Sequence, residues 1–313
     1  PSALGEYVAR RFGHLPYLLK ALDVKDMLSI QVHPSKAGAS RDFHEENDKG
    51  IPLDSPVRNY KDDNHKPELM VAMGDFWLLH GFKPEGEIKK TLTGTPELRL
   101  LLPVFEQSGY RGLYQHVMEM PQQQVNAQLQ PLLDRIIPLY QKAELKKSQA
   151  DYWAAKAALK FSQPGQIDRG IFSIYLFNLV ELHKGEAIFQ DAGVPHAYLE
   201  GQNVEIMASS DNVLRGGLTN KHIDVKELLK HVKTEATVPQ VLKGAKNGAE
   251  LIYKTPAPDF ELSSYKLHHS DSVTILPQTA EIFLLVDGTI ELENKQLKVT
   301  LKKGQPSAIV LPG

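Results

Sequence analysis

Two polar side chains interrupt an apolar stretch near the beginning of the sequence. In "LSIQVHPSK", Ile30 and Val32 alternate with Gln31 and His33, and such alternation is typical of a β-strand. Side chains two residues apart in a strand point to the same face, so Gln31 and His33 share one. On a solvent-exposed face this pair needs nothing more, whereas in a barrel interior it needs polar partners.

Two further segments carry residue types that bind metal ions. "NHKPEL" contains His65, Lys66 and Glu68, and "AGVPHAYLEG" contains His196 after a Gly-x-Pro turn. Two imidazoles, a carboxylate and a side-chain amide form a ligand set that suits zinc or another divalent metal. The 12 histidines of the chain also produce suggestive spacings by chance. Spacing alone therefore leaves a metal site and ordinary polar strand residues equally open.

The overall composition excludes several classes of protein. The formal net charge of -2 gives no general attraction to nucleic acid or to an anionic membrane. The absence of cysteine excludes disulfides, thiolate metal sites and a cysteine nucleophile, and it fits a cytoplasmic location. No apolar run has the length of a membrane span. The chain begins without methionine, so we expect it to be a piece of a longer protein.

The elements that must position these residues are expected to be mainly strands. Short apolar segments punctuated by Gly and Pro fill residues 15–33, 66–82 and 171–210 and the last stretch from about 254, a rhythm typical of a sandwich or barrel. The Lys-Gly turn in "VELHKGEAIFQDAGVPH" recurs in "VTLKKGQPSAIVLPG", which suggests two related barrels. Chance similarity between two hairpins is the alternative.

Residues 85–161 differ from the rest because helix-favouring residues dominate them. Four apolar residues there fall at helical spacing: Leu129, Leu132, Leu133 and Ile136. This composition predicts a helical insertion within the strand-rich sequence. A later short helix, "DVKELLKHV", has Asp224 as its predicted N-cap.

Three motifs together resemble those of type I phosphomannose isomerases, a family of the cupin superfamily. They are "LSIQVHPSK", "HKPEL" and "GVPHAYLEGQNVEIMASSDNVLRGGLTNKHID". The similarity covers most of the chain and is strongest over residues 168–224. It implies one zinc ion per chain, with four ligands at the matching positions: Gln31, His33, Glu68 and His196.

The resemblance also implies a fold of two cupin-like (jelly-roll) β-barrels with a helical insertion domain. The catalytic barrel would comprise residues 1–83 and 166–240, the insertion residues 84–165, and the second barrel residues 241–313. The family has an N-terminal strand segment before the point where this chain begins, which we expect to leave the first barrel incomplete. Asn220 stands where the family commonly has proline.

The implied reaction interconverts mannose 6-phosphate and fructose 6-phosphate through an enediol. The resemblance gives three catalytic candidates: Arg215, Asp211 and Glu205. Lys66 is a fourth, because it lies two residues before Glu68 and an extended segment would place both side chains in one cavity. Arg215 would stabilise the enediolate or bind phosphate. Three more residues are predicted to contact the phosphorylated sugar: Ser29, Lys36 and His65. For Lys36 and Lys221 an ordinary solvated lysine is nearly as good an interpretation, and the identity of the proton-transferring base stays open.

Two other classes of function compete with an isomerase. An iron-dependent cupin dioxygenase commonly has a His-x-His pair, where this chain has Gln31-Val32-His33. A sugar-binding cupin without catalytic activity would tolerate the loss of Lys66, Asp211 or Arg215, and all three are present. Metal analysis together with an assay on mannose 6-phosphate would distinguish the three.

Overall fold

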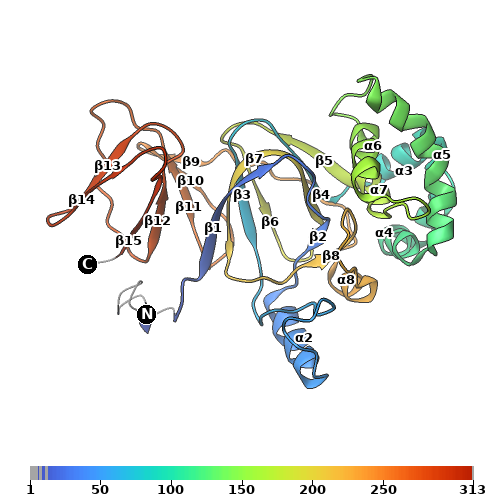
Figure 1. Ribbon diagram of the computed structural model, residues 1–313, viewed down its shortest axis with the longest axis horizontal. Helices are drawn as coiled ribbons and strands as arrows, with labels where there is room; N and C mark the ends of the chain where they lie inside the picture. Colours follow the sequence, from blue (N-terminus) through green and yellow to red (C-terminus); the bar gives the residue numbers. More distant parts are fainter. Residues whose placement is uncertain (1–5, 7–8, 11–12, 312–313) are drawn as a thin grey trace.

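The computed structural model describes residues 6, 9–10 and 13–311, which mix helix and strand. Helix accounts for 31% of the chain and strand for 26%, so the expectation of a mainly β protein is not confirmed. Much of the helix lies between β4 (Phe76–Phe82) and β5 (Phe177–Leu182). Figure 1 shows the C-terminal strands, a central sheet and these helices following one another along the long axis.

The central sheet has eight strands, and one long strand belongs to both of its halves. Besides β4 and β5, its strands are β1 (Tyr17–Val24), β2 (Gln31–Val32), β3 (Glu68–Ala72), β6 (Ala187–Gln190), β7 (His196–Ala208) and β8 (Leu214–Arg215). The first residues of β7 pair with β4 and β2, and the later residues pair with β1 and β3. Side chains from both halves therefore pack together, as those of Val24, Leu78 and Ile188 do.

Gly201 marks the point where β7 changes partners. Glu200 pairs with Trp77 of β4, and the next residue, Gly201, pairs with Val24 of β1. Gly201 has φ +131°, and a Cβ added there would lie 2.6 Å from the ring of Phe76. Only glycine allows this close approach of backbone and ring.

The two faces of the β3–β7 ladder have different surroundings. Leu69 lies opposite Ile206, and both pack with Tyr253 and Phe260 of the C-terminal part. Because successive side chains of a strand alternate between faces, Glu68 points to the other side, into the interior of the sheet. The C-terminal part thus covers the outer face of the strand that carries this carboxylate.

Most of the helices form one block beside the sheet (Figure 1). The helices are α2 (Lys36–Asp48), α3 (Glu85–Gly94), the 3₁₀ turn η1 (Pro96–Leu98), α4 (Leu101–Glu119), α5 (Gln122–Gln141), α6 (Ala150–Phe161), α7 (Gly170–Leu176) and α8 (Val225–His231). The helical spacing predicted within α5 is confirmed, because its four apolar residues are all buried. The predicted cap of α8 is confirmed too, since the side chain of Asp224 accepts a hydrogen bond from the N–H of Glu227 at 3.0 Å.

Neither of the two expected jelly-roll barrels is confirmed in the described part of the chain. The central sheet does not close, because β5 pairs only with β4 and β8 pairs only with β2. The C-terminal strands are β9 (Ala245–Asn247), β10 (Glu250–Tyr253), β11 (Leu262–Tyr265), β12 (Glu281–Leu284), β13 (Ile290–Glu293), β14 (Lys298–Leu301) and β15 (Ser307–Val310). They form three separate small sheets. Each of these strands has at most four residues. That is too few to pair with two halves of a sheet, as β7 does.

The two Lys-Gly turns noted in the sequence share a backbone conformation. Gly185 has φ +85° and Gly304 has φ +91°, values that glycine adopts at no steric cost. Each turn joins two strands that pair with other partners: β5 with β4 and β6 with β3, and β14 with β13 and β15 with β12. The turn at Gly185 closes no hairpin, whereas Lys302 and Gln305, which flank the turn at Gly304, pair in one antiparallel bridge. The similarity therefore does not extend beyond the conformation of the two glycines.

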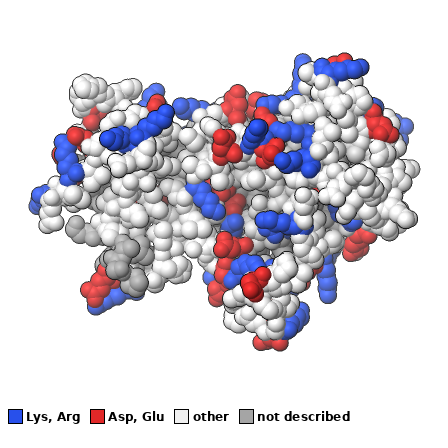
Figure 2. Space-filling view, viewed as in Figure 1, with Lys and Arg blue, Asp and Glu red and all other residues white. Residues whose placement is uncertain are grey.

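The surface carries charges of both signs. Figure 2 shows Lys and Arg interspersed with Asp and Glu on the face that is viewed. No helix among the described residues has both the length and the apolar character needed to cross a membrane.

Candidate metal centre

Three buried side chains, carried by three separate strands, meet between the two halves of the central sheet. His33 directly follows β2, Glu68 begins β3 and His196 begins β7. His33 Nε2 lies 3.3 Å from Glu68 Oε1, and His196 Nε2 lies 3.4 Å from Glu68 Oε2. Each residue is at most 3% exposed. Their ligand atoms all lie within 4.8 Å of one another, close enough to hold one metal ion.

Backbone contacts orient both imidazole rings toward this point. His33 Nδ1 lies 2.7 Å from the carbonyl oxygen of Asn212, and His196 Nδ1 lies 3.0 Å from that of Val194. A carbonyl oxygen only accepts hydrogen bonds, so each Nδ1 is the donor, and the neutral form of each ring has its lone pair on Nε2. Such contacts also hold metal-ligating histidines in position.

The imidazole nitrogens and the carboxylate together form a site that favours a bound cation. Burial lowers the pKa of His33, which favours the neutral ring. Its Nε2 has no hydrogen-bond partner, although it faces the carboxylate of Glu68. Two lone pairs and an anion thus converge in a buried space, an arrangement that a bound divalent cation would satisfy.

Lys66 supplies part of the positive charge near this carboxylate. Its Nζ lies 3.2 Å from Glu68 Oε1, and both side chains are nearly inaccessible to solvent. Burial alone raises the pKa of Glu68, but Lys66 and any proton that His33 or His196 carries on Nε2 outweigh it and hold the pKa well below the ordinary value. Glu68 is therefore an anion in the folded protein. Because the two residues lie two apart, the extended backbone places both side chains in one space, as the sequence predicted.

Gln31 lies beside the three residues. It is directly opposite His196 in the β2–β7 ladder and opposite Arg215 in the β2–β8 ladder. Residues directly opposite in a ladder share a face, so these three side chains are neighbours. Ile30 and Val32 pack instead into the large apolar cluster that includes the helices. The alternation in "IQVH" therefore separates a core-facing side from a site-facing side.

Arg215 is a cation without a carboxylate partner among the described residues. It is half-buried, and burial is the cause of its lowered pKa. A guanidinium held beside a metal centre in this way is available to an anionic ligand.

Glu205 lies further along β7, on the interior face of the same strands. The hydroxyl of Tyr198 donates to Glu205 Oε1 at 2.5 Å. Burial and the nearby charge of Glu68 raise the pKa of Glu205 to about 8. The carboxyl group can therefore carry a proton near neutral pH, as an acid–base residue must.

Sequence reasoning missed four residues of the strands around this centre. Lys20 of β1 lies directly opposite Glu205 and is exposed; as the one lysine in the apolar alternation of "YLLKALDV", it could have been noticed. Gln190 and Asn203 are buried, and neither amide has a hydrogen-bond partner. His80 lies opposite His196, with its Nδ1 also unpartnered. No local pattern marks these three, because only the strand pairing brings them together.

The other predicted residues lie in loops or at the beginning of α2. Asp211 is exposed in the loop between β7 and β8, and Ser29 is half-buried before β2. Lys36 Nζ donates to Asn64 Oδ1 at 2.7 Å, and His65 Nε2 lies 2.9 Å from Asp259 Oδ2. Lys221 is exposed. The strands thus bring Gln31, His33, Glu68, His196, Lys66, Arg215 and Glu205 to one interior face, whereas the roles of the loop residues stay predictions.

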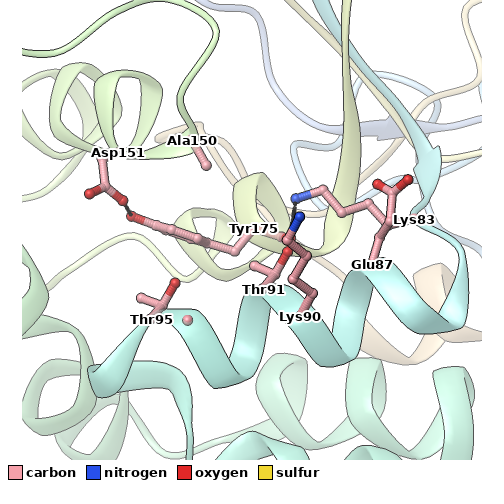
Figure 3. Close-up of a pocket in the computed structure, with 9 residues that line it drawn as sticks. Lys83, Glu87, Lys90, Thr91, Thr95, Ala150, Asp151 and Tyr175 are labelled. Carbon is pink, nitrogen blue, oxygen red and sulfur yellow. Dashed lines mark hydrogen bonds between the residues drawn. The ribbon is translucent and has the colours of Figure 1, made fainter.

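A separate cavity opens between α3 and α7. It has a volume of about 520 Å³ and is lined by Lys83, Glu87, Lys90, Thr91, Gly94, Thr95, Ala150, Asp151 and Tyr175 (Figure 3). It shares no residue with the metal centre.

Comparison with known proteins agrees with this geometry. The sequence model of the catalytic domain of type I phosphomannose isomerase matches residues 2–85. The mannose-6-phosphate isomerase of Escherichia coli K12 is 39% identical over 98% of this chain and 77% of its own length. The human mannose-6-phosphate isomerase is 33% identical over 97% of this chain and 74% of its own length.

Comparison with solved structures also finds mannose-6-phosphate isomerases. The Salmonella typhimurium enzyme bound to zinc and its substrate fructose 6-phosphate superimposes with a TM-score of 0.84 at 34% identity, covering 99% of this chain and 77% of that one. A mutant of the same enzyme gives a TM-score of 0.86. The chain therefore belongs to the type I phosphomannose isomerase family.

Proposed function

We propose that this protein is a zinc-dependent aldose–ketose isomerase that interconverts mannose 6-phosphate and fructose 6-phosphate. The observation that carries the proposal is the convergence of the Nε2 lone pairs of His33 and His196 on the carboxylate of Glu68. The names of the relatives and the zinc and fructose 6-phosphate bound in the Salmonella enzyme support it.

His33, Glu68 and His196 would hold the zinc ion, with the amide oxygen of Gln31 as the fourth ligand. Three neutral ligands and one carboxylate leave net positive charge on a divalent ion. When bound, zinc acts as a Lewis acid that polarises sugar oxygens without any redox change. The hydrogen bonds that His33 and His196 make to backbone carbonyls hold both rings ready for this role.

The isomerisation requires a proton to move between C2 and C1 of the open-chain sugar. Glu205 is the best-supported candidate for this transfer, because its buried carboxyl group can both hold and release a proton near neutral pH. Tyr198 fixes its orientation by donating to Oε1. Lys66 and Asp211 are the other candidates for the transfer. The site residues thus include more than one group able to exchange protons.

The substrate also carries a phosphate dianion, which needs cationic partners. Arg215 is placed for this role or for stabilising the enediolate, because it shares a face with Gln31 and lacks a carboxylate partner among the described residues. Ser29, Lys36 and His65 are the predicted further contacts to the sugar phosphate. A planar guanidinium matches the oxygens of either anionic group.

The proposal keeps the domain division expected from the sequence. Residues 1–83 and 166–240 would form the catalytic unit, in the manner of a cupin barrel. Residues 84–165 would form the helical insertion and residues 241–313 a second cupin-like unit. A cytoplasmic location remains a prediction as well.

One experiment tests the activity. The purified protein is stripped of metal with a chelator, reloaded with zinc, and assayed with mannose 6-phosphate and fructose 6-phosphate in both directions. We expect turnover only in the zinc-loaded protein. Oxygen consumption with iron would instead favour the dioxygenase, and sugar binding without turnover would favour a non-catalytic cupin.

Substitution of Arg215 tests its role. If it stabilises the enediolate, Arg215→Ala should lower kcat by about 10²–10³-fold, the usual effect of removing one preorganised donor, with zinc content unchanged. If it only grips the phosphate, KM should rise while kcat holds. Arg215→Lys keeps the charge and loses the planar fork, so partial rescue would favour charge over geometry. Unchanged kcat and KM in zinc-loaded Arg215→Ala would remove it from the site.

A further inference from the structure

The segment that follows Arg215 has an unfavourable backbone conformation. Gly217 has φ +128° and Leu218 has φ +53°. A bulky side chain rarely adopts a positive φ, and such a residue persists only where its surroundings hold it. The question is what holds Leu218, three residues beyond the guanidinium.

Asp168, at the entrance of α7, makes the contacts that hold this segment. Its Oδ1 accepts hydrogen bonds from the N–H of Leu218 at 2.9 Å and of Gly170 at 2.7 Å. Its Oδ2 accepts from the N–H of Thr219 at 3.2 Å. One carboxylate thus ties α7 to two consecutive backbone amides of the segment.

The two backbones also touch directly. A Cβ added to Gly217 would lie 2.4 Å from the Cα of Gly170, and one added to Gly170 would lie 2.8 Å from the backbone nitrogen of Leu218. No side chain fits between them. A small shift of α7 would therefore move the segment with it.

The segment in turn is fixed to the strand that carries Gln31. The N–H of Gly216 donates to the carbonyl of Ile30 at 2.9 Å, and the N–H of Ile30 donates to the carbonyl of Gly217 at 3.0 Å. Arg215 itself lies opposite Gln31. The end of β8 is thus held on one side by β2 and on the other by Asp168.

We infer that Asp168 is a positioning residue for Arg215, whose carboxylate fixes the strained Gly217–Leu218 segment and so directs the guanidinium toward the metal centre. The inference rests on the proposed function, and within it on the role of Arg215 in stabilising the enediolate, the role that affects kcat. It assigns to the residue at the entrance of α7 a task in the active site. Asp168 does this without touching the substrate.

Asp168→Asn is the main test, because the amide keeps the volume but replaces one acceptor oxygen with a donor that faces backbone N–H groups. In the zinc-loaded protein we expect kcat for mannose 6-phosphate to fall about 10- to 100-fold, as for a misplaced catalytic group. Zinc content should not change. A kcat within about twofold of wild type would overturn the inference.

The same substitution in the Arg215→Ala background separates positioning from general stability. If Asp168 acts through Arg215, the second substitution should lower kcat further by only about twofold or less. A merely structural role would cost the same factor in both backgrounds and would overturn the inference. If Arg215→Ala itself leaves the kinetics unchanged in an active, zinc-dependent enzyme, the role of Arg215 fails while the isomerase activity stands.

Asp151→Asn is the matched control. Asp151 accepts a hydrogen bond from the hydroxyl of Tyr175 at 2.7 Å, at the opposite end of α7 (Figure 3). The substitution Asp151→Asn should loosen α7 as well, but leave kcat near the wild-type value. An equal loss of kcat in this control would assign the effect to α7 as a whole and overturn the inference.

Should Asp168→Asn not fold, as judged by thermal unfolding, Asp168→Ser replaces it. A serine hydroxyl is smaller and can accept one of the three backbone hydrogen bonds. We expect an intermediate loss of kcat that is again absent in the Arg215→Ala background. An equal loss in both backgrounds would contradict the positioning role.

Discussion

Asp42, Glu227 and His231 form a second group whose ligand atoms lie within 4.8 Å of one another, as do those of His33, Glu68 and His196. Asp42 comes from α2, and the other two come from α8. By residue type alone, either group is a reasonable metal site. The two differ in what the protein already provides to their oxygen and nitrogen atoms.

Both carboxylate oxygens of Asp42 have protein donors. Lys230 Nζ lies 2.6 Å from Oδ1, Arg41 Nε lies 2.8 Å from the same oxygen, and His231 Nε2 lies 2.8 Å from Oδ2. The hydroxyl of Tyr60 donates to Glu227 at 2.9 Å. The charge of Asp42 is thus neutralised by side chains, and this group ties α2 to α8.

Around Glu68 the protein supplies one ammonium group, from Lys66. The two imidazoles face the carboxylate with lone pairs, and His33 Nε2 has no partner. A cluster of ligand residues therefore indicates a metal site only when its lone pairs are left without protein donors. By this criterion the group of His33, Glu68 and His196 is the metal site. The group of Asp42, Glu227 and His231 instead stabilises the contact between α2 and α8.

The largest expected effect comes from a paired substitution. His33→Ala should lose zinc and lower kcat/KM by about 10³-fold or more, since metal catalysis contributes several kcal/mol. His231→Ala should keep stoichiometric zinc and most of the activity. Metal content by mass spectrometry and the isomerase assay check both. Stoichiometric zinc in His33→Ala would show that the ligand assignment is wrong.

An intermediate effect is expected on stability. Asp42→Asn should reduce the free energy of unfolding by about 2 kcal/mol, less than the usual cost of breaking a fully buried pair, because Lys230 is 34% exposed. Zinc content should stay at one ion per chain. Thermal unfolding and metal analysis measure the two quantities. Loss of zinc without loss of stability would reverse the roles of the two groups.

The smallest expected effect is a difference in response to acid. Burial alone raises the pKa of Asp42, but hydrogen bonds from Arg41, Lys230 and His231 outweigh it and hold the pKa well below the ordinary value of 3.8. The unfolded carboxyl binds its proton near that ordinary value and the folded one only far below it. The stabilisation is therefore complete above about pH 5 and is lost as the pH falls below about 4 toward the folded pKa.

Zinc should leave at a higher pH, because protons compete with the metal for His33 and His196. Bound zinc after buffer exchange, and the unfolding temperatures of wild type and Asp42→Asn, are measured at stepwise lower pH. We expect zinc to be lost while the difference in unfolding temperature is still constant. Loss of zinc and of the difference in unfolding temperature at the same pH would mean that the group at Asp42 and the metal centre are not independent.

The sequence by itself determined the local features of this protein. The alternation around Gln31 and His33, the helical spacing within α5 and the N-cap at Asp224 depend only on neighbouring residues, so they can be predicted from them. The long ordered motifs also determined the family. The metal ligands could be proposed from these motifs, although they come from three distant segments.

Only the tertiary structure decided what depends on pairing between distant segments. The register of β7 places Lys20 opposite Glu205 and His80 opposite His196, and the β2–β8 ladder places Gln31 opposite Arg215. The contact of Asp168 with Leu218 joins residues 50 apart in the chain. The donors that satisfy Asp42 come from both α2 and α8. Such contacts leave no periodicity in the sequence, because they arise from how separate elements pack and not from the conformation of any one of them.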